Sequence, residues 1–207
     1  FAFLGFYIAR PEFRGRGIGY ALWQAALDAC PATTIGLDGV VAQQDNYRRS
    51  GFTLVHRNVR FAGRVAVGEP DLSDIVPVDA ARIDAVAAYD RGCFPAPRRA
   101  FLDAWLSAPD HVGLAATAGD RPTGYGVIRP CREGHKIGPL FADDAAIAER
   151  LFCALAATAP DATIILDPPE PNSAATELCR RHGMAPVFET ARMYRGPAPA
   201  LPLDRNF

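Results

Sequence analysis

The stretch Arg14-Gly15-Arg16-Gly17-Ile18-Gly19 lies between an apolar run over residues 1–9 and a segment of helical periodicity over residues 18–29. The apolar run has the length and composition of a β-strand. The first amide groups of a helix are free to bind an anion, and glycines let the backbone approach that anion closely. Because Arg14 and Arg16 add positive charge, the stretch predicts a loop that binds a phosphate group at the start of a helix.

The overall composition is that of a globular protein without a strongly charged partner. The chain has 207 residues, 22 Lys+Arg against 23 Asp+Glu, and a hydrophobic fraction of 49%. This length suits one large or two small domains. The charge balance argues against a nucleic-acid partner, and no apolar run reaches the roughly 18 residues of a membrane span.

The cysteines and histidines show no metal-binding spacing. The five cysteines are far apart, no C-x-x-C occurs, and the four histidines do not lie beside them in the sequence. We therefore expect reduced thiols, no disulfide framework and no metal site in a cytoplasmic protein. These residues are Cys30, Cys93, Cys131, Cys153 and Cys179, and His56, His111, His135 and His182.

The pattern of elements suggests that the chain contains two copies of one unit. The first half predicts a strand (1–9), a helix (18–29), a strand (34–37), a helix (43–50) and one or two strands (52–66). We expect Ile18, Leu22, Ala25 and Ala29 to form the buried face of the first helix. A turn-rich boundary follows at 67–71.

The second half ends with the same order of elements. It predicts a strand (71–78), helices (79–91 and 97–108), a hairpin (111–117 with 124–129), a strand (136–141), a helix (143–158), a strand (163–166), a helix (173–182) and a strand (186–194). We infer a duplication with copies at 1–68 and 69–207. The first copy is expected to lack its front, roughly 60 to 70 residues, because the second has about that many before the equivalent strand.

Two interpretations of the glycine-rich loop remain open from the residues alone, and a third is excluded. A dinucleotide loop needs G-x-G-x-x-G directly after the strand, whereas the spacing here is G-x-G-x-G, although Asp38 lies where a ribose-binding acid could stand. A P-loop is excluded because no G-K-[ST] follows. A tight turn that only packs the helix on the strand also remains open.

Two motifs at the proper separation resemble the GNAT N-acetyltransferase superfamily. Arg14-x-x-Gly17-x-Gly19 resembles that family's [RQ]-x-x-G-x-[GA] pyrophosphate loop, and Tyr47-x-x-x-Gly51-Phe52 resembles its Y-x-x-x-G-F helix end. The resemblance covers residues 1 to about 60. It implies an α/β (α+β) fold with two GNAT-like mixed, twisted sheets flanked by helices, the first copy incomplete, and acetyl-CoA as the co-substrate with no metal.

The resemblance also implies roles for individual residues. Tyr47 would protonate the leaving thiolate, and a β-bulge in a strand from Phe6 to Arg10 would present the Ile8 amide to the thioester carbonyl. The family's pantetheine-binding Asn is replaced by Val40, and Asn46 is the candidate substitute. The residues expected to bind acetyl-CoA are Tyr7, Ile8, Ala9, Arg14, Gly15, Arg16, Gly17, Ile18, Gly19 and Asn46.

Residues 69–207 resemble a second GNAT domain with a weaker site. Asn172-x-x-Ala175-x-x-Leu178-Cys179-x-x-x-Gly183-Met184 matches the helix motif, with Cys179 at the tyrosine position. The equivalent phosphate loop, Gly138 to Asp144, has neither Arg nor G-x-G, although Asp143 and Asp144 suit a helix start. We therefore expect the main site in the first copy. Asn172 and Cys179 are candidates for a second site, with a buried, inert thiol as the alternative for Cys179.

The sequence thus favours transfer of an acetyl group from acetyl-CoA to a primary amine of a small molecule, protein or peptide. The rival is a non-catalytic acyl-CoA-binding or regulatory module, and a NAD-dependent oxidoreductase is a further alternative. Arg98 and Arg99 either meet an anionic substrate or are ordinary exposed helix arginines.

Overall fold

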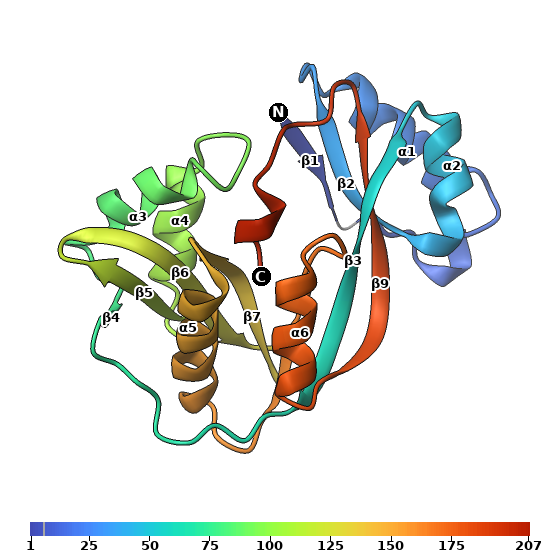
Figure 1. The fold of residues 1–207 in the computed structure, drawn as a ribbon. Coiled ribbons are helices and arrows are strands. Elements are labelled where there is room, and N and C mark those ends of the chain that lie inside the picture. The colour runs from blue at the N-terminus through green and yellow to red at the C-terminus, as the bar shows by residue number, and fades with distance from the viewer. Residues whose placement is uncertain (6) are drawn as a thin grey trace. The chain divides into compact units, whose positions relative to one another are not determined.

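The computed structural model describes residues 1–5 and 7–207 and divides them into two compact units (Figure 1). Unit 1 contains Phe1–His56 and Thr190–Pro199, and unit 2 contains Arg57–Glu189 and Ala200–Phe207. Each unit therefore combines segments that are far apart in the sequence. The expected boundary at 68/69 concerns two sequence copies rather than these units, and it stays a prediction.

Unit 1 contains a small sheet and two α-helices. Along the chain, α1 lies between β1 and β2, and α2 follows β2. Its strands have the order β1-β2-β9, with β1 parallel and β9 antiparallel to β2. Leu37 of β2 is paired with Met193 of β9, so the end of the chain completes this sheet. The elements are β1 (Ala2–Leu4), η1 (Pro11–Phe13), α1 (Ile18–Asp28), β2 (Ile35–Val40), η2 (Val41–Gln43), α2 (Gln44–Arg49) and the last part of β9 (Ala185–Arg195).

The buried face of α1 differs from the one expected. Ile18 and Leu22 are exposed, and Trp23 and Leu27 are buried instead. Trp23 and Leu27 are four residues apart, so they share one face of the helix. Burying an indole removes more apolar area from water than burying smaller side chains, and this decides how the helix is rotated. The core they join contains Ile35, Leu37, Phe52, Ala191 and Met193.

The strand expected over residues 1–9 is wrong beyond its first part. β1 ends at Leu4, and Tyr7 to Arg10 belong to no strand, while Phe6 lies outside the described residues. β1 stands at the edge of the strand order, so it is held on one side only. The ring of Tyr7 packs on Trp23, with 5.7 Å between the centroids. The described residues of the expected Phe6–Arg10 strand therefore do not form the predicted bulge.

Unit 2 is a larger mixed sheet flanked by helices, as expected for the fold class. The strand order is β3-β8-β7-β6-β5-β4, with β7 and β8 parallel and the neighbours β3/β8, β4/β5, β5/β6 and β6/β7 antiparallel. The elements are β3 (Thr53–Arg64) from Arg57 onward, β4 (Ile75–Pro77), α3 (Ile83–Asp90), α4 (Arg99–Leu106), β5 (Val112–Ala118), β6 (Arg121–Pro130), β7 (His135–Ala142), α5 (Ala145–Ala157), β8 (Thr163–Leu166), α6 (Ser173–Arg181), the first part of β9 and η3 (Leu203–Arg205).

Helices cover both faces of the unit 2 sheet. Ala115 and Ala116 are neighbours on β5 but belong to different core clusters, because successive strand residues point to opposite faces. Val86 of α3 and Leu102 of α4 lie in the cluster with Ala115. The other cluster contains residues of α5 and α6. No described helix is long and apolar enough to span a membrane.

A buried ion pair joins α3 to the start of α4. The Asp90 side chain is 1% exposed and the Arg98 side chain 17% exposed. Arg98 donates from Nε and Nη2 to Asp90 over 2.9 and 2.6 Å, and the Tyr125 hydroxyl donates to the same carboxylate over 2.5 Å. Arg98 is therefore engaged by the core, while Arg99 forms exposed ion pairs with Asp84 and Asp103.

We predict that Asp90→Asn lowers the free energy of unfolding by about 3 kcal/mol, because it leaves a buried guanidinium without its counter-charge. Urea unfolding followed by circular dichroism measures this loss. Asp103→Asn is the control, because its ion pair with Arg99 is exposed and such pairs stabilise little. Equal stability losses in the two variants would show that the Asp90 pair has no special role.

Candidate functional site

The glycine-rich loop has a backbone that requires glycine at two positions. Gly15 and Gly17 have φ angles of +73° and +76°, where other L-residues are strained. Gly17 is the N-cap of α1. Because glycine has no side chain, the cap residue does not occupy the first amides of this helix. The first turn of α1 also contains no acidic residue. These amides and the helix dipole therefore favour an anion.

The two arginines of the loop have different surroundings. Arg14 donates from Nε to the Ala9 carbonyl over 3.0 Å, which ties the loop back onto the preceding segment. The Arg16 guanidinium lies 5.6 Å from the centroid of the Phe13 ring. Both arginines are exposed. Arg14 thus shapes the loop, and Arg16 supplies positive charge near the start of α1.

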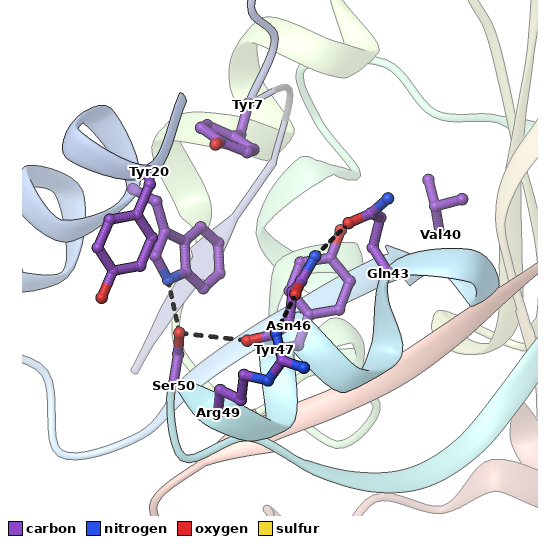
Figure 2. A pocket seen from close by; sticks show the side chains of 9 residues that line it. Tyr7, Tyr20, Val40, Gln43, Asn46, Tyr47, Arg49 and Ser50 are labelled. Carbon is purple, nitrogen blue, oxygen red and sulfur yellow. Dashed lines mark hydrogen bonds between the residues drawn. The ribbon is translucent and has the colours of Figure 1, made fainter. Parts of the chain in front are cut away.

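A cavity of about 730 Å³ opens in unit 1 between α1, the end of β2 and α2 (Figure 2). Its size lies within the range of about 300–1,000 Å³ that is usual for small-molecule sites. Four of the side chains that line it are aromatic. The lining residues are Tyr7, Tyr20, Trp23, Val40, Gln43, Asn46, Tyr47, Arg49 and Ser50.

Trp23 forms the wall that joins α1 to α2. Its ring centroid lies 5.6 Å from those of Tyr47 and Phe52. Its indole N–H donates over 2.9 Å to the Oγ atom of Ser50, the residue directly after α2. The buried indole is therefore satisfied, and the distance between the two helices is set by one rigid side chain.

Tyr47 faces the cavity as a neutral phenol. Partial burial raises its pKa above the usual 10.0, and the Tyr7 phenol adds to this, while a backbone hydrogen bond with Val40 acts in the opposite direction. A Cβ atom on Gly39 would lie 2.3 Å from Cε2 of the Tyr47 ring. Glycine in β2 therefore makes room for the ring, and Tyr47 holds a proton at neutral pH.

Asn46 lines the cavity, but its amide already has partners at the N-cap and at the last residue of α2. Its Nδ2 donates to Gln43 Oε1 over 2.5 Å, and its Oδ1 accepts from Arg49 Nη1 over 3.1 Å. Val40, at the position of the family's Asn, is half exposed at the cavity wall. A role of Asn46 in binding the pantetheine arm stays a prediction.

The structure thus gathers Tyr7, Asn46 and Tyr47 from the expected set at one cavity. Ile8 is 70% exposed, and neither it nor Ile18 belongs to the lining. Sequence reasoning missed further lining residues, of which Tyr20 and Trp23 are the largest. Their spacing of three residues directly after the loop was a usable signal, because it places both on one face of α1.

Asn172 serves the fold of unit 2. It is the N-cap of α6, where its Oδ1 accepts from the Ala175 amide over 3.1 Å. Its Nδ2 donates to the carbonyls of Asn206 and Asp204 over 2.8 and 3.3 Å. The amide therefore ties the end of the chain to α6.

Cys179 and the acidic pair at α5 also have structural surroundings. Cys179 is fully buried, and burial raises the pKa of its thiol to about 12. Asp144 is the N-cap of α5 and accepts from the Ile147 amide over 2.9 Å, as its position predicted. Asp143 forms an ion pair with Arg205. The start of α5, where the sequence predicted the second loop, thus presents two carboxylates.

Comparisons with known proteins place the chain in one family. The model described as "Acetyltransferase (GNAT) domain" matches residues 86–206, and the one described as "Acetyltransferase (GNAT) family" matches residues 1–52. The chain is 32% identical over 202 residues to holothin acyltransferase of Pseudoalteromonas sp. strain SANK 73390. This match covers 96% of the chain and 68% of that protein.

Two solved acetyltransferase structures have the same fold at low sequence identity. A candidate acetyltransferase of Pyrococcus horikoshii is 24% identical with a TM-score of 0.82, covering 99% of this chain and 68% of that one. A GCN5-related N-acetyltransferase of Sphaerobacter thermophilus is 17% identical with a TM-score of 0.59, covering 92% and 72%. These structures show the shared fold, and the family models together with the 32% identical relative show that the chain belongs to the GNAT acetyltransferase family, as an acyltransferase of that type.

Proposed function

We propose that this chain transfers an acetyl group from acetyl-CoA to a primary amine, using a site in the first copy, residues 1–68. The observation that carries this proposal is that two features lie beside the same helix, α1: an anion-binding loop at its start and a cavity along its side. The loop before α1 offers free amides and cationic charge, and the cavity beside α1 holds the protonated phenol of Tyr47. A thioester substrate with a distant pyrophosphate needs both features.

The loop is the proposed binding site for the pyrophosphate. Its free helix amides, its glycine backbone and the exposed Arg16 suit two adjacent phosphates. The residues proposed to bind acetyl-CoA are Tyr7, Ile8, Ala9, Arg14, Gly15, Arg16, Gly17, Ile18, Gly19 and Asn46. The GNAT model that matches residues 1–52 supports this assignment, because it covers the whole set.

Tyr47 is the proposed general acid. When an amine attacks the thioester carbonyl, the sulfur leaves as a thiolate and needs a proton. A phenol whose pKa is raised by burial remains protonated at neutral pH and can supply that proton. The amine must lose its own proton before it attacks, and water or a base is required for that step.

The acceptor is proposed to be a small molecule with a flat or apolar part. Tyr7, Tyr20 and Trp23 give the cavity an aromatic wall, against which a planar group would stack. The relative named holothin acyltransferase supports acyl transfer as the reaction. Residues 69–207 are proposed as a second GNAT copy without its own acetyl site, because Asn172 and Cys179 are engaged in the fold.

We predict that Tyr47→Phe lowers kcat by about 10²- to 10⁴-fold, the usual effect of removing a general acid, with little change in KM for acetyl-CoA. The assay follows release of the CoA thiol with a panel of small aromatic amines. Tyr20→Phe removes a hydroxyl from the same cavity and should change kcat far less. Unchanged turnover in Tyr47→Phe refutes the catalytic assignment. If acetyl-CoA binds but no amine is acetylated, the chain is a binding module.

The raised pKa of Tyr47 predicts the alkaline side of the pH profile. A general acid works only while protonated, so kcat should hold through neutral pH and fall only above the ordinary tyrosine value of about 10. The measurement is kcat at a saturating amine concentration from about pH 6 to about pH 11, a range that spans the ordinary tyrosine pKa of about 10. The fall should be absent in the residual activity of Tyr47→Phe, and its persistence there would assign it to another group.

Arg16→Ala is predicted to weaken acetyl-CoA binding about tenfold, equivalent to about 1.4 kcal/mol, because one charge contact to the pyrophosphate is lost. Titration calorimetry with acetyl-CoA, in the absence of an amine, measures this affinity. The same variant should bind acetyl-pantetheine, which lacks the pyrophosphate, as the unaltered protein does. Arg132→Ala, an exposed arginine of unit 2, is the matched control. Tight binding of NAD with no binding of CoA would favour the dinucleotide alternative.

A further inference from the structure

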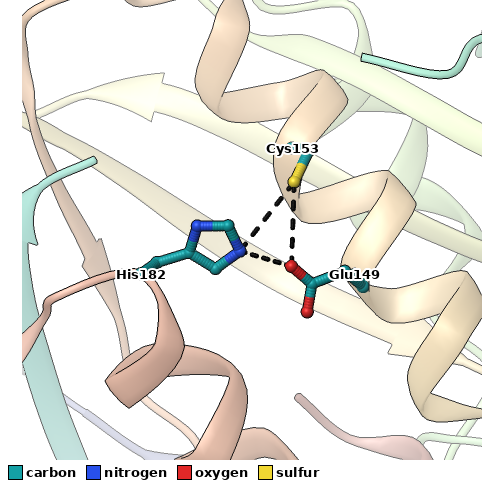
Figure 3. Close-up of side chains that lie close together, drawn as sticks. All are labelled: Glu149, Cys153 and His182. Carbon is teal, nitrogen blue, oxygen red and sulfur yellow. Dashed lines mark hydrogen bonds and ion pairs between the residues drawn. The ribbon is translucent and has the colours of Figure 1, made fainter. Parts of the chain in front are cut away.

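Three side chains with different ligand atoms converge between α5 and α6 in unit 2 (Figure 3). Glu149 and Cys153 lie four residues apart on α5, so both project from one face of that helix. His182 is the C-cap residue of α6. The sequence did not reveal this group, because His182 is far from Cys153 along the chain and becomes its neighbour only when the helices pack.

The polar atoms of these side chains point toward a common centre (Figure 3). Cys153 Sγ lies 3.9 Å from Glu149 Oε1 and 3.9 Å from His182 Nε2. His182 Nε2 and Glu149 Oε1 are hydrogen-bonded to each other. The His182 side chain is 14% exposed and that of Glu149 30% exposed, so solvent ions can reach the group.

The arrangement does not match a nucleophilic Cys-His-Glu triad. In a triad the histidine meets the nucleophile with one ring nitrogen and the carboxylate with the other. Here the thiol and the carboxylate both approach the same nitrogen, Nε2. Three donor atoms that face one point are instead the pattern of ligands around a metal ion.

We propose that Glu149, Cys153 and His182 form a binding site for a divalent transition-metal ion, with zinc as the best match. One thiolate, one imidazole and one carboxylate are all common zinc ligands. A carboxylate and a thiolate together neutralise the two charges of the ion. Arg181 binds the other carboxylate oxygen, Oε2, and so orients Glu149 from the second side. Water would complete the coordination.

The observed separations require only small movements to accept the ion. Zinc bond lengths of about 2.0–2.3 Å place ligand atoms of a tetrahedral site about 3.5 Å apart. The two sulfur distances of 3.9 Å would shorten slightly. The ion would replace the proton shared by His182 Nε2 and Glu149 Oε1. These two atoms would then move apart to the spacing of metal ligands. The site would then cross-link α5 and α6, and it does not depend on the proposed acetyl transfer.

The test uses the whole chain, freed of metal with a chelator and titrated with Co²⁺ as a spectroscopic probe for zinc. We expect a thiolate-to-cobalt charge-transfer absorption band that saturates at one equivalent and disappears when Zn²⁺ is added. The band should be absent in Cys153→Ala, and His182→Ala should weaken Co²⁺ binding at least tenfold. Cys131→Ala, which removes a partly buried thiol outside the group, is the control and should keep the band.

Thermal unfolding gives a second readout that needs no activity. Zn²⁺ should raise the Tm of the unaltered chain and of Cys131→Ala, because an ion that binds only the folded state stabilises it. Zn²⁺ should not raise the Tm of Cys153→Ser, which keeps the size of the side chain. A titration of the unaltered chain without a saturable band, or a band that persists without Cys153, overturns the proposal even if a variant folds poorly.

Discussion

The indole of Trp23 is the contact on which the candidate site depends. It packs against the rings of Tyr7, Tyr47 and Phe52 and donates its N–H to Ser50. These contacts fix the rotation of α1 and its distance from α2. The same helix begins at Gly17, so the rotation set by Trp23 also sets where its free amides point. The glycine-rich loop and the cavity at Tyr47 are therefore both positioned by one buried aromatic side chain.

Unit 1 is completed by residues from the far end of the chain. The last part of β9 pairs with β2 along residues 35–40, and Arg192 forms a two-bond ion pair with Asp38 over 2.6 and 2.9 Å. The charge of Asp38 and the hydrogen bonds raise the pKa of Arg192 against the opposing effect of burial. Asp38, which in a dinucleotide site would bind a ribose, is thus committed to a strand contact. This structural role weakens the dehydrogenase alternative.

A motif shows which residue occupies a position, but not whether its polar atoms are free. Asn172 matches the family motif, yet its amide is bonded to the Ala175 amide and to the carbonyls of the last turn. Asn46 is engaged by Gln43 and Arg49 in the same way. Tyr47 differs, because it lies at a cavity as a neutral phenol. This contrast between Tyr47 and the two engaged asparagines is physical, and it supports the site proposed in residues 1–68.

The sequence by itself determined the local features: the glycines of the loop with their positive φ angles, the Asp144 cap and nearly every helix and strand. These follow from backbone sterics and periodicity, which act over a few residues. The tertiary structure alone decided that Trp23 rather than Leu22 is buried, that β1 stops at Leu4, and that β9 joins β2. It also brought His182 to Cys153. Each of these outcomes depends on which distant surfaces bury the most apolar area together, and spacing along the chain does not contain that information.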